Sequence, residues 1–235
     1  MRRSCNLRQA DQRGFTVIEM LIATVAFTSV LMLITTGVIH FSNQYYKAVN
    51  ANATQNLVRT ISEEITQSLQ FSGGKVANQL PAPNATNLAT QCVGTKKYIF
   101  RPAVAYDGEA TERTNPGLYV VPWDSDVDGA CDKPAGALPG GGKQLLQGNM
   151  RLTQFTIIED VAAGSEMYTV ALRIAYGDND LLCSPTVGNC DTGFNGNNVP
   201  IANNGSDINC RTTTGSQFCA VSNINATVVS RVAGP

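Results

Sequence analysis

The uncharged stretch MLIATVAFTSVLMLITTGVI, residues 20–39, decides the fold class of this chain. At a rise of about 1.5 Å per residue, a helix of this length reaches roughly 30 Å, which is the thickness of the hydrocarbon core of a bilayer. The stretch therefore predicts a transmembrane helix near the N-terminus. The alternative interpretation is a buried helix of a soluble protein.

The residues on either side of this stretch indicate its orientation and its fate. Residues 1–14 carry four arginines and a single acid, Asp11. By the positive-inside rule, the N-terminus stays in the cytoplasm and the rest of the chain is exported. Residues 41–46, FSNQYY, follow without the small-residue site at which a secretory signal is cleaved. We therefore expect the apolar helix to be retained in the membrane.

Two residues at the start of the apolar stretch do not fit a generic anchor. Gly14 separates the basic leader from the apolar residues, and Glu19 lies within them. A carboxylate inside a membrane is costly, so such charges usually have a partner. If the chain were cleaved after Gly14, the new α-amine of Phe15 would be a cation. That cation could neutralise Glu19 of a neighbouring chain.

The segment RGFTVIEMLI, residues 13–22, resembles the class III signal of type IV prepilins. In that family a membrane aspartyl peptidase cleaves after the glycine and methylates the new N-terminal phenylalanine. The glutamate five residues into the mature chain guides assembly. The resemblance therefore implies cleavage between Gly14 and Phe15, N-methylation of Phe15 and an assembly role for Glu19. The alternative is a signal-anchored exported protein with an accidental glycine and glutamate.

The resemblance also implies where the chain resides. The precursor would lie in the inner, cytoplasmic membrane with its N-terminus in the cytoplasm. The mature chain would then enter an extracellular pilus or a periplasmic filament. Residues 1–14 would be the cleaved leader and residues 15–40 the hydrophobic transmembrane and assembly helix.

Residues 41–74 predict an amphipathic continuation of the same helix. Apolar residues recur there at every fourth position, which is typical of one helical face. These residues are Val49, Ala53, Leu57, Ile61, Ile65 and Leu69. A strict spacing of four drifts by about 40° per step around a straight helix, so the stripe would face both its own domain and a neighbouring helix. Gly73 and Gly74 would end the helix near residue 71. A separate surface helix is the alternative.

Residues 75–235 predict a globular α+β head. Residues 75–95, rich in Asn, Ala and Pro, indicate an irregular connection. Strand patterns follow at residues 98–100, 118–122, 152–158, 168–176 and 220–229. The clearest is YTVALRIAY, residues 168–176, where large apolar side chains alternate with smaller or polar ones. We expect it to form a hairpin with the preceding strand. Antiparallel strands on the apolar face of a long helix resemble the pilin lollipop.

The cysteines favour an exported head. Of seven cysteines, Cys5 lies in the leader and the other six lie in the head, as a disulfide framework requires. Proximity in sequence suggests the pairs Cys92 with Cys131, Cys183 with Cys190, and Cys210 with Cys219. A zinc site would need close Cys-x-x-Cys pairs, and the sequence has none. Residues 183–219, rich in Asn and Gly, resemble the disulfide-bounded C-terminal region of pilins; a plain surface loop is the alternative.

One segment is a candidate calcium loop. In WDSDVDGACD, residues 123–132, acids at alternate positions precede a glycine, as in the first half of a calcium-binding loop. The second half does not match, because Ala135 occupies the position of the bidentate glutamate. The candidate ligands are Asp124, Asp126, Asp128 and Asp132. A solvated acidic turn is the alternative, and we expect the chain to require no cofactor.

Composition excludes several function classes. Only 15% of the residues are charged and the net charge is −1, so direct nucleic acid binding has no support. His40 is the only histidine, which excludes His-clustered metal sites and Ser-His-Asp catalysis. The adjacent carboxylates at 63–64 and 159–160 point apart on a helix or strand. We therefore expect that the chain is not an enzyme.

These observations together favour a structural subunit of a type IV pilus or related filament. The rather large head and its six cysteines favour a minor pilin or pseudopilin over an abundant major subunit. Its partners would be other pilin subunits in a helical filament, the prepilin peptidase and the membrane. One alternative is a pseudopilin of a type II secretion or DNA-uptake system. Others are a non-polymerising signal-anchored adhesin or binding protein, and a membrane-tethered hydrolase.

Overall fold

The computed structural model describes nine segments of the chain. They are residues 14–71, 76–79, 88–106, 117–124, 130–132, 138–159, 167–183, 208–212 and 215–231. Contacts along the chain group it into two compact units, Met1–Gln44 and Tyr45–Pro235. The single described α-helix, α1, supplies the first unit with its apolar segment and the second with part of its core.

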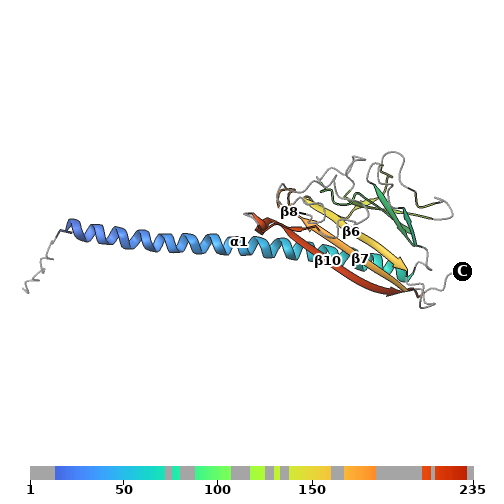
Figure 1. Ribbon diagram of the computed structural model, residues 1–235, viewed down its shortest axis with the longest axis horizontal. Coiled ribbons are helices and arrows are strands. Elements are labelled where there is room, and N and C mark those ends of the chain that lie inside the picture. The colour runs from blue at the N-terminus through green and yellow to red at the C-terminus, as the bar shows by residue number, and fades with distance from the viewer. Residues whose placement is uncertain are drawn as a thin grey trace, which may run out of the picture. The chain divides into compact units, whose positions relative to one another are not determined.

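Helix α1 spans Val17–Gln70, a continuous run of 54 residues (Figure 1). Thr16 lies immediately before it, and its Oγ1 accepts a hydrogen bond from the Glu19 N–H at 3.3 Å. Serine or threonine followed three residues later by glutamate is the sequence of a capping box, which fixes a helix N-terminus. At the C-terminal end of α1, the Phe71 N–H donates to the Gln67 carbonyl at 3.3 Å. The prediction of one long helix is confirmed, with bounds shifted by one or two residues.

In the second unit, α1 buries one face. The buried residues of this face are Thr54, Val58, Ile61, Ser62, Ile65 and Leu69. Their spacing of three and four follows the true helical period of about 3.6 residues. Of the predicted stripe of every fourth residue, Ile61, Ile65 and Leu69 are buried, whereas Val49 and Ala53 are exposed. The expected drift therefore carries the early part of the stripe away from the core.

A three-stranded antiparallel sheet packs against this helix face. It contains β6 (Met150–Glu159), β7 (Met167–Tyr176) and β10 (Ala220–Val229), in the order β10-β7-β6. In Figure 1, the C-terminal part of α1 lies alongside these strands. All three were predicted within two residues, and the paired β6 and β7 match the expected hairpin partners. In β7, Tyr168, Val170, Leu172 and Ile174 are buried and belong to the same core as Ile61 and Ile65.

A second antiparallel sheet has five strands in chain order. They are β1 (Val76–Gln79), β2 (Ala89–Val93), β3 (Lys96–Phe100), β4 (Leu118–Pro122) and β5 (Lys143–Gln144). A separate pair is formed by β8 (Leu182–Cys183) and β9 (Asn209–Cys210), and a short 3-10 helix, η5 (Ser216–Phe218), precedes β10. The prediction of an irregular connection over residues 75–95 is wrong for β1 and β2. Strand β2 is buried throughout, and its polar Thr90 and Gln91 hide the apolar pattern that marks a strand.

The two large sheets and the helix share one core, which makes the fold α+β as expected. Aromatic rings join the sheets: Phe155 of β6 lies 5.6 Å from Tyr98 and 5.4 Å from Phe100, both of β3, between ring centroids. Lys96 at the start of β3 donates to the Glu64 carboxylate of α1 at 2.6 Å. Burial, and secondarily the charge of Glu64, raises the pKa of the Tyr98 hydroxyl.

Among the described residues, one cation is buried on the other face of β6, between core residues Met150 and Leu152 in sequence. Arg151 of β6 is 1% exposed, and its guanidinium donates to the Gly177 carbonyl at 2.6 Å and to Asn179 Oδ1 at 2.7 Å. Burial lowers the pKa of Arg151 to about 10, and nearby Asp178 partly opposes this shift. The arginine therefore fastens the turn after β7 to β6, because a buried charge is tolerated only with such partners.

The helix–sheet contact predicts a large difference between two apolar positions of α1. Ile65→Ala should lower the free energy of unfolding of the second unit by about 2–5 kcal/mol, because a fully buried side chain leaves a cavity. Val49→Ala, at a position 44% exposed, is the control and should change it by at most about 0.5 kcal/mol. Urea unfolding of the full chain in detergent, followed by circular dichroism, measures both. Equal losses would contradict this packing.

Candidate functional site

The residues of the predicted cleavage site lie just before α1. Residues 14–16 have no regular secondary structure, and Phe15 is 77% exposed. Beyond its two chain neighbours, no heavy atom of the described residues lies within 4 Å of the position that a Cβ would occupy on Gly14. A peptidase needs an extended, accessible peptide, because a helical segment hides its backbone groups in internal hydrogen bonds. The structure thus presents the Gly14–Phe15 bond in an accessible form.

Glu19 lies in the first turn of α1, and its side chain is exposed. The backbone N–H groups of a first turn give the helix N-terminus a partial positive charge, which suits a carboxylate there. Within the described part of the chain, Glu19 has no cationic partner. The carboxylate is therefore positioned by the helix and available to a cation from elsewhere.

The apolar surface of α1 in the first unit is exposed over its whole circumference. Every large apolar side chain from Val17 to Ile39 is at least 44% exposed. By length and hydropathy the helix is able to cross a membrane. Its hydroxyl groups donate to helical carbonyls three or four residues earlier, so they leave no free donor toward an apolar environment. These residues are Thr24, Thr28, Ser29, Thr35 and Thr36.

Disulfides stabilise the second unit. Cys92 of β2 is bonded to Cys131, and Cys210 of β9 is bonded to Cys219, the same two pairs that proximity in sequence suggested. Cys183 is also disulfide-bonded; Cys190, its expected partner, lies outside the described residues. Disulfides persist in oxidising compartments. Together with the exposed apolar helix, they indicate a membrane-anchored, extracytoplasmic protein.

The candidate calcium loop is described only at its two ends. The Trp123 N–H donates to the Thr95 carbonyl at 2.8 Å, and Thr90 Oγ1 donates to the Cys131 carbonyl at 3.1 Å. Asp124 and Asp132 adjoin these anchored positions, whereas Asp126 and Asp128 lie outside the described residues. Among the residues that are described, no group of three or more acids, histidines or cysteines is placed to hold a metal ion. Calcium binding stays a prediction of the sequence.

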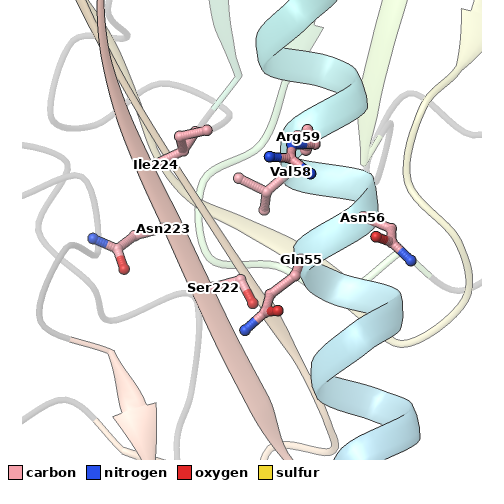
Figure 2. Close-up of a pocket in the computed structure, with 7 residues that line it drawn as sticks. All are labelled: Gln55, Asn56, Val58, Arg59, Ser222, Asn223 and Ile224. Carbon is pink, nitrogen blue, oxygen red and sulfur yellow. The ribbon is translucent and has the colours of Figure 1, made fainter.

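A groove lies between α1 and β10 (Figure 2). Its volume is about 280 Å³, and its lining residues are Gln55, Asn56, Val58, Arg59, Ser222, Asn223 and Ile224. Arg59 lies 3.9 Å from the Glu63 carboxylate in an exposed pair. The lining carries amides, a hydroxyl and one guanidinium, but no carboxylate, imidazole or thiol. It therefore offers hydrogen bonds but no general acid or base for catalysis.

Polar residues of α1 contact the end of the second unit nearest residue 45, and sequence reasoning missed them. Asn50 Nδ2 donates to the Gln217 carbonyl at 3.3 Å, and Ser222 Oγ donates to Thr54 Oγ1 at 3.0 Å. One turn earlier, the ring of Tyr46 lies 5.4 Å from that of Phe218. Residues 46, 50 and 54 are four apart, so they share one face of the helix. That spacing was the available signal, but polar residues on a buried face leave no hydrophobic pattern.

Comparison of the chain with protein-family models, with curated proteins and with solved structures finds no match. The candidate site is therefore defined by its own residues: an accessible Gly14–Phe15 bond, the first-turn carboxylate of Glu19 and the exposed apolar surface behind them.

The two described disulfides should contribute unequally to stability. They close loops with sequence separations of 39 and 9 residues. Chain-entropy arithmetic gives a loss of about 4 kcal/mol for Cys92→Ala/Cys131→Ala and about 2.6 kcal/mol for Cys210→Ala/Cys219→Ala. Urea unfolding, followed by circular dichroism, measures the free energy of unfolding of each variant. A larger loss for the shorter loop would contradict this ranking.

The Thr54–Ser222 hydrogen bond should contribute more to the free energy of unfolding than a hydroxyl that bonds only within its own helix. Thr54→Val keeps the shape of the side chain but leaves the buried Ser222 hydroxyl without its acceptor, at a cost of about 1–3 kcal/mol in the free energy of unfolding. Thr60→Val is the matched control, because exposed Thr60 donates only to the Asn56 carbonyl of its own helix. Its effect should be at most about 0.5 kcal/mol.

A double variant separates the contact from its packing. Thr54→Val/Ser222→Ala removes both hydroxyls and should recover most of the loss, since a polar pair replaced by apolar groups of similar shape is nearly neutral. Urea unfolding of the three variants is the measurement. No recovery in the double variant would show that the hydrogen bond is not the cause.

Proposed function

We propose that this chain is a subunit of a type IV pilus or a related filament, made as a prepilin and processed between Gly14 and Phe15. The observation that supports it most directly is the placement of Glu19. The carboxylate lies in the first turn of an exposed apolar helix, five residues after an accessible glycine. No cationic side chain among the described residues pairs with it.

Processing would create the missing cation. Hydrolysis of the Gly14–Phe15 peptide bond adds water across it and leaves a carboxylate on Gly14 and an ammonium group on Phe15. Methylation of that amine, as the resemblance to prepilins implies, keeps its positive charge. Thr16, whose Oγ1 accepts the Glu19 N–H, caps α1 and would remain after cleavage, so this capping contact needs no residue of the leader.

Assembly would then pair charges between chains. The Glu19 carboxylate of one subunit would neutralise the Phe15 ammonium of its neighbour in apolar surroundings. An opposite charge at close range is worth far more there than in water. A subunit without the carboxylate would leave the amine unpaired, which is costly in the same surroundings.

The apolar surface of α1 would move from lipid to neighbouring helices. Residues 17–39 expose large apolar side chains on all sides, as a helix that is first in a bilayer and later in a bundle requires. Because both environments are apolar, this transfer needs no rearrangement of the helix itself. Internally bonded hydroxyls such as those of Thr28 and Thr35 suit either environment.

Within this class we favour a minor pilin, in accordance with the cysteine-rich head, and a structural rather than a catalytic role. The described groove between α1 and β10 supports a structural role, because its lining lacks acid–base groups. A pseudopilin of a secretion or DNA-uptake system shares the same N-terminal chemistry. A non-polymerising signal-anchored adhesin differs from both, because it would retain residues 1–14.

The assembly role predicts a specific defect. Glu19→Ala should leave processing intact, giving the mass of a chain that begins at N-methylated Phe15, but should strongly reduce its recovery in sheared filaments. Glu63→Ala is the control, because this carboxylate of the same helix is exposed and pairs only with nearby Arg59. Intact-mass analysis and quantification of the filament fraction in the native host measure both.

Two outcomes would overturn the proposal in different ways. If the wild-type chain kept residues 1–14, the processing step would be wrong and a plain signal anchor would be favoured. If the chain were processed but Glu19→Ala entered filaments at the level of Glu63→Ala, the charge pairing would be wrong.

A further inference from the structure

Three exposed aromatic side chains gather at the start of the second unit. Tyr45 and Tyr46 of α1 lie with ring centroids 6.1 Å apart, and Phe218 of η5 lies 5.4 Å from Tyr46. The three are 59%, 47% and 44% exposed, respectively. We call them the aromatic patch. Exposed aromatic clusters that do not serve folding mark an interaction surface.

The patch is held in place by several contacts. Gly215, with a φ of 94°, starts η5, and the Phe218 N–H donates to the Gly215 carbonyl at 2.9 Å. Cys219, the next residue, is fixed to Cys210 by a disulfide. The Asn50 amide holds the Gln217 carbonyl from α1. Phe218 is therefore presented on a braced turn rather than on a free loop.

The spacing along the chain gives the patch its depth relative to a membrane. If residues 20–39 fill the hydrocarbon core, Tyr45 follows its last residue by six helical positions, which is about 9 Å. The headgroup layer of a bilayer is roughly 5–8 Å thick on each side. Helical side chains tilt toward the N-terminus, so both tyrosine rings reach back toward that layer.

The chemistry of the patch matches the same layer. Tyrosine has an apolar body and a polar hydroxyl, and it is enriched where hydrocarbon meets water. Lys47, the next residue, is exposed and is the first charged residue after Glu19. An ammonium group at this depth is attracted to lipid phosphates.

We propose that the aromatic patch is a membrane-interface contact, through which the second unit binds the headgroups of the bilayer that α1 crosses. This inference depends on the proposed membrane span of α1 but not on cleavage or filament assembly. Phe218 is the informative residue, because it belongs to the folded unit and not to the anchor helix. Lipid contact at Phe218 would orient the whole unit against the surface.

The test places a fluorescent probe at three sites of the full chain in lipid nanodiscs. Phe218→Trp reports on the patch, Val229→Trp is the control and Phe27→Trp reports on the span, each made with Trp123→Phe. Val229 is a matched control because it is 55% exposed at the opposite end of β10, where the Arg231 N–H donates to the Gln70 carbonyl. Lipids with a nitroxide on the headgroup or on the acyl chain are the quenchers.

The proposal expects headgroup nitroxides to quench the probe at 218 several-fold more strongly than the probe at 229, and acyl-chain nitroxides to quench the probe at 27. Equal headgroup quenching at 218 and 229, with the probe at 27 still quenched, would overturn the membrane-interface contact but not the membrane span. Absence of quenching at 27 would overturn the proposed span as well.

Two further measurements protect this conclusion. The same Phe218→Trp and Val229→Trp pair in the parent chain, where buried Trp123 adds an equal signal to both, guards against a folding defect of Trp123→Phe. Repeating the quenching at lower protein density distinguishes lipid from a second copy. Protection of the probe at 218 that disappears on dilution would assign the patch to a neighbouring chain and overturn the lipid contact.

Discussion

The first half of α1 imposes one constraint on the whole protein. Its apolar surface is not covered by other described residues of the chain, so another apolar environment must cover it. Large apolar side chains from Val17 to Ile39 are exposed on all sides, and one carboxylate lies among them. A bilayer satisfies the side chains but not the charge. A bundle of identical helices satisfies both, because each chain brings a carboxylate and, once processed, an amine. Under the proposed function, the bilayer would be the environment of the helix before assembly and the helix bundle its environment afterwards.

The second half of α1 solves the opposite problem of holding a folded unit with one helix face. Apolar residues of α1 from Val58 to Leu69 belong to the core that both large sheets share, and the Lys96–Glu64 pair adds a charged contact to the second sheet. Nearer to residue 45, hydrogen bonds from Asn50 and Thr54 replace apolar packing. Hydrogen bonds are directional, so they fix the register of β10 along the helix more strictly than methyl groups would.

Sequence periodicity was sufficient where burial follows a regular pattern. Strands β6, β7 and β10 alternate or are richly apolar, and α1 contains no proline, so these elements could be predicted to within two residues. Strand β2 was missed because Thr90 and Gln91 are buried polar residues, and Thr90 donates to the Cys131 carbonyl, a partner distant in sequence. The contact of Tyr46 with Phe218 was missed for the same reason, since it joins residues far apart in the chain. The roles expected for Gly14 and Glu19, in contrast, rest on local sequence alone and stay predictions.

The capping of α1 by Thr16 bears on the order in which the chain would fold, be cleaved and assemble. Since the side chain that starts the helix and the glutamate of its first turn both belong to the retained part, the precursor and the mature chain need not differ in conformation. Under the proposed function, cleavage would then change the charge of the chain without changing the conformation of the helix: four guanidinium groups and the Asp11 carboxylate depart, and an ammonium group appears on Phe15. On this proposal, folded precursors would accumulate in the membrane without assembling, and hydrolysis of one peptide bond would determine when each becomes competent to polymerise.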